Sequence, residues 1–268
     1  MHQLEVAVRR EMELPHGLDD TRGMSAGALA ELIRNRQPCV ALTGAGISTE
    51  SGIPDFRSPT GIWAQFDPME YATISAFRRD PEKVWSFYAP RFGMLTSAQP
   101  NDAHRVLASL EARGLVRAVV TQNIDLLHER AGSRDVVEVH GSIRECNCLE
   151  CGASYPLASV QRLLEGMAVP RCEACGSVLK PGVVMFGELL PAGAIDRAFA
   201  LAREASLLLV IGSSLEVTPV ASLPAETIDA GGAVAIVNVG PTAFDARATL
   251  KVEGEAGVVL RAVALQLP

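Results

Sequence analysis

Several side chains that can do chemistry stand directly after short apolar runs. Asn123 and Asp125 follow the run Ala118–Thr121, and His140 follows the run 136–139. The carboxyl ends of parallel strands meet at one sheet edge, where α/β proteins bind ligands. An amide, a carboxylate and a histidine that titrates near neutral pH can hold a polar ligand and move a proton there. Two structural alternatives stay open, because Asn and Asp also cap helices and a lone histidine is often structural.

A glycine-rich turn follows the first apolar run, Cys39–Thr43. Gly44 and Gly46 permit a tight turn in which free backbone N–H groups and a helix N-terminus can hold a pyrophosphate. The full G-x-G-x-x-G pattern fails, because Thr49 stands at the third glycine position. A glycine turn without a ligand therefore remains an alternative.

The segment 52–57, GIPDFR, lies directly behind this turn. Phe56 offers a ring that can cover an apolar or aromatic group, and Arg57 offers a cation that can pair with a phosphate. The alternative is a surface loop with an ordinary salt bridge.

Two C-x-x-C pairs, separated by twenty residues, indicate a four-thiolate zinc ribbon formed by Cys148, Cys151, Cys172 and Cys175. Four thiolates complete a tetrahedron and leave no position for water, so the metal is expected to be structural. Redox pairs or buried free thiols are the alternatives. Cys146 is a spare thiol beside the first pair, and Cys39 is expected to be buried in a strand.

The elements that position these residues follow an alternating pattern. Helices are expected at 104–113 and 194–203, and a first helix is expected to begin after an N-cap at Ser25. Strands are expected at five apolar runs: Cys39–Thr43, Ala118–Thr121, 136–139, Leu207–Ile211 and 233–239. Strands that alternate with helices predict an α/β fold with a doubly wound parallel sheet. Two stretches outside this alternation, 54–100 and the cysteine segment, predict a second, smaller lobe.

Composition limits the partners of this chain. Its 268 residues are 48% hydrophobic and 21% charged, so we expect a folded protein of one to two domains. The net charge of −7 argues against direct nucleic-acid binding and against an anionic membrane, and it leaves room for a basic polypeptide as partner. No apolar run approaches the roughly 20 residues needed to cross a bilayer. The N-terminal residues lack an apolar core typical of signal peptides, so a cytoplasmic location is expected.

Taken together, the ordered motifs resemble the sirtuin family from about residue 25 to the C-terminus. The resemblance is carried by GAGIS at 44–48, GIPDFR at 52–57, TQNID at 121–125, His140-Gly141, both cysteine pairs, FGE at 186–188, GSSL at 212–215 and IVN at 236–238. It implies an N-terminal extension over 1–24 and a Rossmann-type NAD-binding domain over 25–53, 101–140 and 186–268. It also implies a small domain over 54–100 and 141–185, composed of a helical module and a zinc ribbon.

The resemblance also assigns roles to residues. NAD as cosubstrate would contact Gly44, Ala45, Gly46, Thr49, Phe56, Arg57, Gln122, Asn123, Ile124, Asp125, Gly212, Ser213, Ser214, Asn238 and Ala256. The residues implied for catalysis are His140 as general base, with Asn123 and Asp125. An acyl-lysine protein or peptide would contact Ala72, Tyr88, Arg91, Val184, Phe186, Gly187, Glu188 and Val217, pairing as an added strand.

The implied activity is NAD-dependent protein-lysine deacylation. The acyl oxygen attacks the nicotinamide ribose, and the products are deacylated lysine, nicotinamide and O-acyl-ADP-ribose. Deacetylation is expected. Tyr88 and Arg91, with the small Ala72, are similar to a subgroup that removes succinyl and malonyl groups, since a phenol and a guanidinium can bind a carboxylate. The alternative is that both side chains merely belong to the surface of a helix over 81–88.

Two other functions stay open at this point. One is mono-ADP-ribosyl transfer in the same cleft, which would leave ADP-ribose on a protein. The other is a non-catalytic module that binds NAD or zinc, against which the joint presence of Asn123, Asp125 and His140 argues.

Overall fold

The computed structural model describes residues 20–267, and residues 20–24 by their backbone alone. A six-stranded sheet has the order β3-β2-β1-β7-β8-β9, and every pair of neighbouring strands in it is parallel. Its strands are β1 (Cys39–Thr43), β2 (Ala118–Thr121), β3 (Val136–Glu138), β7 (Leu207–Ile211), β8 (Ala233–Asn238) and β9 (Leu250–Glu253). The order reverses at β1 and β7, which places a topological switch point at the end of β1.

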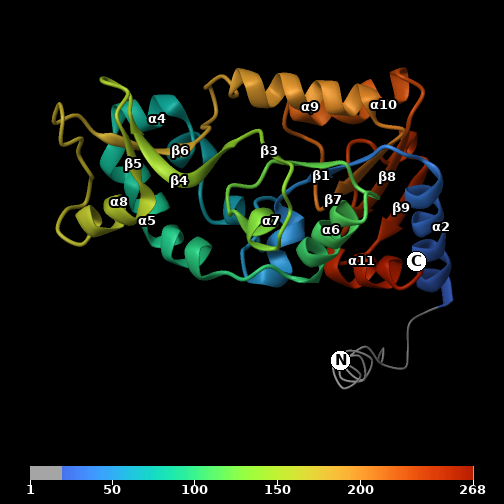
Figure 1. Cartoon of the computed structure of the whole chain (residues 1–268). Coiled ribbons are helices and arrows are strands. Elements are labelled where there is room, and N and C mark those ends of the chain that lie inside the picture. The colour runs from blue at the N-terminus through green and yellow to red at the C-terminus, as the bar shows by residue number, and fades with distance from the viewer. Residues whose placement is uncertain (1–19, 268) are drawn as a thin grey trace, which may run out of the picture.

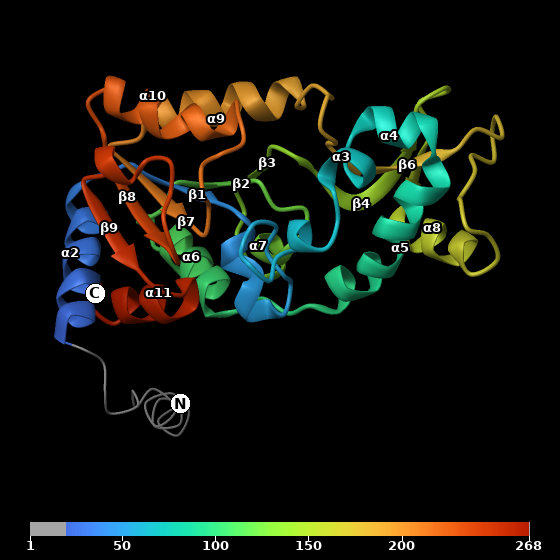
Figure 2. The same ribbon diagram turned by 180° about the vertical axis from the view of Figure 1, so that it is seen from behind.

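Helices cover both faces of this sheet (Figures 1 and 2). One face packs against α2 (Asp20–Asn35), α6 (Asp102–Ala112) and α11 (Ala256–Ala264), and the other against α9 (Ala192–Glu204) and α10 (Leu223–Asp229). Alternate residues of β1 pack into the hydrophobic cores on the two faces of the sheet, with Cys39 and Ala41 on one face and Val40 and Leu42 on the other. Burial on both faces explains why the central strands read as unbroken apolar runs.

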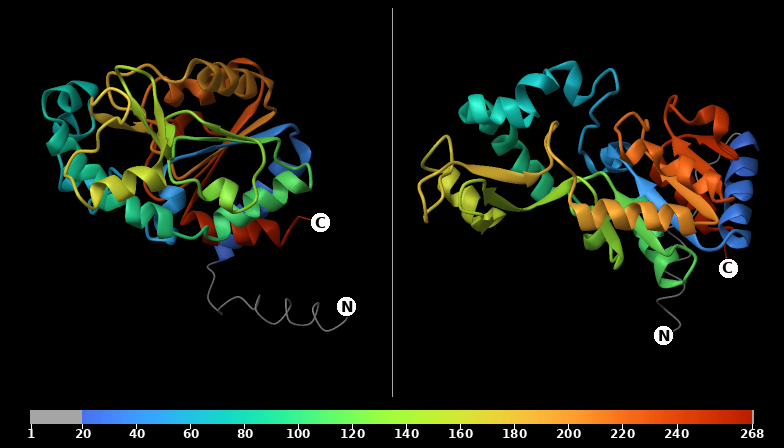
Figure 3. Two further views of the ribbon diagram at one scale, coloured as in Figure 1. Left: turned by 60° about the vertical axis from the view of Figure 1, so that its left-hand side comes forward. Right: turned by 90° about the horizontal axis from the view of Figure 1, so that it is seen from above.

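A second assembly lies beside the sheet (Figure 3) and contains the two C-x-x-C pairs. It holds an antiparallel sheet of β5 (Ser154–Pro156), β4 (Gly141–Cys148) and β6 (Leu179–Val183), with helices α3 (Pro68–Tyr71), α4 (Ile74–Arg79), α5 (Pro81–Ser97) and α8 (Leu157–Leu164). Buried Trp85 joins the helices to the sheet, because its indole N–H donates to the Leu179 carbonyl oxygen at 2.8 Å. Short α7 (Leu127–Arg130) stands between the two assemblies near the end of β2.

Two sequence expectations about helices need correction. The first helix begins at Asp20 rather than after Ser25, so residues 20–24 are helical, while residues 1–19 of the expected extension lie outside the described residues. The helix expected over 81–88 continues to Ser97 and includes Pro90. Buried aromatic residues on both sides of Pro90 hold the helix against the loss of one backbone hydrogen bond.

No helix among residues 20–267 is long and apolar enough to span a bilayer.

Candidate active site

The turns that follow β1 and β7 lie against one another. Gly46 N–H donates to the Gly212 carbonyl oxygen at 2.9 Å, and Gly44 N–H donates to the Ile211 carbonyl oxygen at 3.0 Å. Gly212 has φ +61°, and a Cβ atom there would lie 2.3 Å from the Ile47 nitrogen. Only glycine permits this approach. The structure thus brings the predicted Gly44, Gly46 and Gly212 together at the switch point.

Backbone donors remain free at these turns. The N–H groups of Ala45, Ser213 and Ser214 donate to no protein acceptor within residues 20–267. Gln122 joins this site from β2, because its Nε2 donates to Ser213 Oγ at 2.9 Å. Free amides at a switch point fit the phosphates of a dinucleotide, so the donor set present here fits NAD.

A buried polar network lies at the adjoining edge. Ser48 Oγ donates to Asp125 Oδ2 at 2.7 Å, and Asn123 Nδ2 donates to Ser48 Oγ and to the Gly44 carbonyl oxygen, each at 3.1 Å. Burial raises the pKa of Asp125. Asp125 Oδ1 also accepts from Leu127 N–H at 2.9 Å. Asp125 therefore caps the start of α7, as the structural alternative expected, and also belongs to this polar network. Ser48 was not among the predicted site residues, although it belongs to the GAGIS motif.

His140 extends this edge toward the small sheet. Its Nδ1 lies 3.1 Å from the Gln122 carbonyl oxygen. A carbonyl oxygen only accepts, so Nδ1 carries the proton and Nε2 keeps a lone pair. Burial lowers the pKa of His140 below its usual 6.5. The neutral imidazole is therefore a ready proton acceptor at pH 7.

Further polar groups behind the edge support it and were missed from the sequence. Thr43 Oγ1 donates to Thr121 Oγ1 at 2.8 Å, and His128 Nε2 lies 2.9 Å from Thr43 Oγ1. Thr121 Oγ1 in turn accepts from Asn123 N–H at 3.1 Å. Burial lowers the pKa of His128 well below its usual value and that of neighbouring His104 to about 4. These contacts join residues far apart in the chain, so no local motif indicates them.

Other predicted NAD residues are distributed around these turns. Arg57 Nε pairs with Glu216 Oε2 at 2.8 Å, which is the ordinary salt bridge of the alternative interpretation. The Phe56 ring packs against Trp63 with centroids 5.1 Å apart. Thr49 Oγ1 donates back to the Gly46 carbonyl oxygen at 3.0 Å.

Three more lie further from the network. Half-buried Ile124 packs against the small-lobe core. Asn238, at the end of β8, donates to the carbonyl oxygens of Val239 and Gly240, and buried Ala256 begins α11.

Four of the predicted peptide-binding residues, Val184, Phe186, Gly187 and Glu188, lie in one segment that begins next to His140. Val184 N–H donates to the His140 carbonyl oxygen at 2.8 Å. Phe186 N–H donates to the Ala72 carbonyl oxygen at 2.8 Å, and the Phe186 carbonyl oxygen accepts from Ile74 N–H at 3.0 Å. These contacts bring Ala72, Val184 and Phe186 together, while Val217 lies on the loop after β7 and its carbonyl oxygen accepts from Ala221 N–H.

Tyr88 and Arg91 lie on α5 in different surroundings. Tyr88 is buried, and burial together with the charge of Glu188 raises the pKa of its phenol. The Arg91 guanidinium stacks over the rings of Phe66 and Phe87, with its Cζ atom 4.6 and 3.8 Å from their centroids. Arg91 lines a cavity of about 280 Å³ with Phe66. No hydrogen bond joins Tyr88 to Arg91 among the contacts of the described residues.

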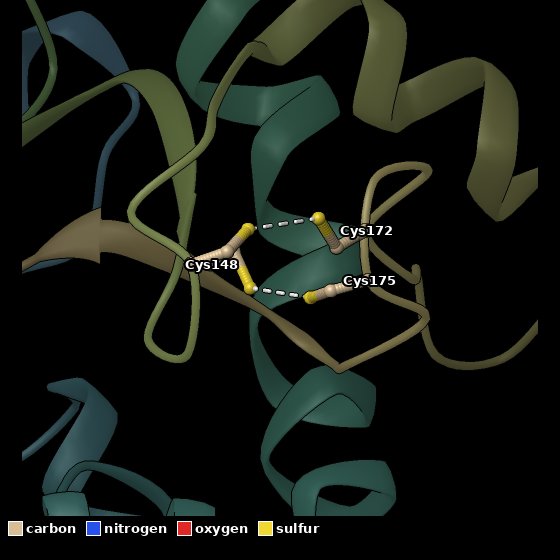
Figure 4. Close-up of side chains that lie close together, drawn as sticks. Cys148, Cys172 and Cys175 are labelled. Carbon is tan, nitrogen blue, oxygen red and sulfur yellow. Dashed lines mark hydrogen bonds between the residues drawn. The ribbon is translucent and has the colours of Figure 1, made fainter.

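Four cysteine sulfurs converge at the far end of the small sheet (Figure 4). The Sγ atoms of Cys148, Cys151, Cys172 and Cys175 lie within 4.8 Å of one another. Four thiols at this spacing fit a tetrahedral structural zinc with no open position. Cys39 is buried in β1 as expected, and Cys146 is buried as well; burial raises the pKa of each thiol to about 12. Neither is therefore a reactive thiol.

The parallel sheet and its polar edge, beside a four-thiolate cluster, define a dinucleotide-binding α/β enzyme with a separate zinc module. The family model described as the Sir2 family matches residues 44–219. A protein named NAD-dependent protein deacylase 1, from Archaeoglobus fulgidus, is 44% identical over 232 residues, which cover 87% of this chain and 94% of that protein. A protein named NAD-dependent protein deacetylase, from Thermotoga maritima, is 46% identical over 221 residues, covering 82% and 89%.

Solved structures agree with these relatives. A structure of Sir2 with a p53 peptide and NAD+ superposes with a TM-score of 0.84 at 43% identity, covering 89% of this chain and 97% of that one. Sir2Tm bound to a propionylated peptide superposes with a TM-score of 0.83 at 42% identity, with the same coverage. This chain belongs to the Sir2 family. It is an enzyme of the NAD-dependent protein deacylase type with NAD as cosubstrate, and its four-cysteine cluster fits a structural zinc.

Proposed function

We propose that this enzyme transfers acyl groups, acetyl foremost, from lysine side chains of proteins to the ADP-ribose of NAD. One water molecule is consumed, because the acyl oxygen bonds to the ribose carbon that nicotinamide leaves, and the products are deacylated lysine, nicotinamide and O-acyl-ADP-ribose. The observation that carries this proposal is the position of His140, whose free Nε2 belongs to a neutral ring while its carbonyl oxygen holds Val184 of the peptide segment. One residue therefore links the proton acceptor with the proposed peptide edge.

In this mechanism NAD, when bound, supplies the electrophilic ribose carbon that receives the acyl oxygen. His140 Nε2 takes the proton of a ribose hydroxyl, which lets that oxygen attack the acyl carbon. The Gln122 carbonyl oxygen fixes the required tautomer by accepting from Nδ1–H. Asn123 and Asp125, joined through Ser48, offer an amide and a carboxylate to the nicotinamide ribose and its carboxamide.

The proposed partner is an acyl-lysine segment in an extended conformation. Neighbouring structures are described as complexes with acetylated and propionylated peptides, which supports this partner class. The proposal keeps the division expected from the sequence, with the NAD domain over 25–53, 101–140 and 186–268, so that both substrates meet where the two domains join.

For the acyl range, we propose that Tyr88 and Arg91 admit succinyl and malonyl groups. Arg91 donates one N–H group to the Phe87 carbonyl oxygen, and its other donors have no acceptor among residues 20–267. A half-buried guanidinium with free donors on a cavity can bind a carboxylate bidentately. Ala72 is small and buried, and its carbonyl oxygen bonds Phe186 of the proposed peptide segment.

The test is turnover of matched acetyl-, succinyl- and malonyl-lysine peptides with NAD, followed by mass spectrometry. Acyl-ADP-ribose with free lysine supports deacylation, and turnover of the acidic acyl groups supports the role of Arg91. ADP-ribose attached to protein would indicate the transferase instead, and no consumption of NAD with any peptide would indicate a binding module.

A further inference from the structure

A buried lysine lies behind the proposed peptide segment. Lys180, on β6, has a side chain only 8% exposed. Its Nζ donates to the carbonyl oxygens of Pro181 at 3.0 Å and Val183 at 2.6 Å, and it lies 2.9 Å from Glu188 Oε2. Three acceptors match the three N–H groups of an ammonium. The charge is thus fully paired within one short stretch of chain.

The Glu188 carboxylate also bonds the backbone of the same segment. Its Oε2 also accepts from Met185 N–H at 2.8 Å, so the ion pair closes a loop from residue 180 to residue 188. Sheet pairing with β4 ends at Val183, and its register already shifts between Gly141 and Cys146, so the part of this loop after Val183 lies outside the ladder. A buried ion pair adds little net stability over apolar packing, and its best-attested use is to select one geometry.

The closed loop leaves few backbone groups unused. Val184 and Phe186 donate to the carbonyl oxygens of His140 and Ala72, and Glu188 N–H donates to the Met185 carbonyl oxygen at 3.0 Å. The Val184 carbonyl oxygen and both polar groups of Gly187 have no protein partner within residues 20–267. The segment therefore presents one free donor and two free acceptors in the stretch that begins at the His140 contact, and an added strand can pair with them.

We infer that Lys180 is a positioning residue for the acyl-lysine peptide. Through Glu188 and the carbonyl oxygens of Pro181 and Val183, it holds the 184–187 edge in the one conformation that pairs with substrate. This inference rests on the proposed function, since it takes the peptide to bind at this edge. It separates peptide recognition from NAD binding, because Lys180 contacts none of the turns after β1 and β7.

The test compares Lys180→Met with Lys83→Met. Lys83 pairs with Glu70 at the surface and lies over the Tyr71 ring, so its variant loses a lysine contact of the same small lobe that involves none of residues 180–188. Binding of a labelled acetyl-lysine peptide is measured by fluorescence anisotropy and binding of NAD by calorimetry. Loss of a buried charge partner predicts about tenfold weaker peptide binding by Lys180→Met, with NAD affinity changed less than about twofold. Lys83→Met is expected to match the wild type in both.

Lys180→Arg keeps the charge for Glu188 and should restore peptide affinity to within about threefold of the wild type. Unchanged peptide binding by folded Lys180→Met would overturn the inference, as would equal losses for peptide and NAD. If Lys180→Met does not fold, Glu188→Gln decides: it keeps an acceptor for Met185 N–H but removes the charge, and unchanged peptide affinity there overturns the inference. A wild-type protein that binds no acyl-lysine peptide would instead refute the proposed function itself.

Discussion

Replacement of His140 separates catalysis from folding. His140→Ala removes the free Nε2 and the hydrogen bond from Nδ1 to the Gln122 carbonyl oxygen. Loss of a general base predicts a fall of about 10²–10⁴-fold in deacylation, or roughly 3–5 kcal/mol of transition-state stabilisation. Loss of one partly buried hydrogen bond predicts only about 1 kcal/mol of stability, which lowers the melting temperature by roughly 2–4 °C in a chain of this size.

The assay for this prediction is steady-state formation of deacetylated peptide, with calorimetric binding of NAD as a check on the site. His140→Gln is the matched control, since its amide can still donate to Gln122 but its side chain is no base. It should regain stability and remain inactive.

In the wild type, the lowered pKa of His140 predicts that activity falls only below pH 6.5, as the ring gains a proton. Normal turnover by folded His140→Ala would refute the reasoning.

Four further changes test other parts of the structure. Cys172→Ser should lose zinc and lower the melting temperature of the small lobe; retained zinc and unchanged melting would contradict the ligand set. Arg91→Met should reduce desuccinylation at least about tenfold more than deacetylation, and equal losses would refute the carboxylate pocket. The pKa of His104 is about 4 in the fold, so the unfolded chain binds the extra proton below pH 6.5, and this residue alone should lower stability in urea by about 2 kcal/mol from pH 6.5 to pH 5. His104→Gln should make the slope shallower by about that amount without abolishing it, because the pKa values of buried His128 and His140 are also lowered; an unchanged slope would contradict the buried neutral ring of His104. Gly212→Ala should destabilise by more than about 2 kcal/mol, whereas Gly114→Ala, at φ +72° in open space, should cost about 1 kcal/mol; similar losses would argue against the close approach of the two turns.

Sequence patterns predicted the features that depend on local spacing, such as the central strands and the cysteine cluster. The strands β1 and β7 were predictable because both faces are buried, which leaves uninterrupted apolar runs. The gathering of Asn123, Asp125 and His140 followed from the rule that parallel strands end at one edge. The cysteine cluster followed from ligand spacing alone.

The features that sequence patterns missed depend on contacts between residues far apart in the chain. Edge strand β9 was missed because it is only partly buried and carries charged residues. Ser48 acts through Asp125, 77 positions away, and His128 contacts Thr43, 85 positions away. From the sequence alone, Lys180 would be expected to lie at the surface. Only the structure shows that it is buried beside Glu188, which is the basis of its proposed positioning role.

The stoichiometry of products tests the central claim most directly. Purified enzyme is incubated with NAD and an acetyl-lysine peptide, and each product is quantified by mass spectrometry. We expect equal amounts of nicotinamide, free-lysine peptide and O-acetyl-ADP-ribose, with formation of all three abolished together by removal of the His140 side chain. Nicotinamide release without acetyl-ADP-ribose, or ADP-ribose fixed to protein in its place, would contradict the account.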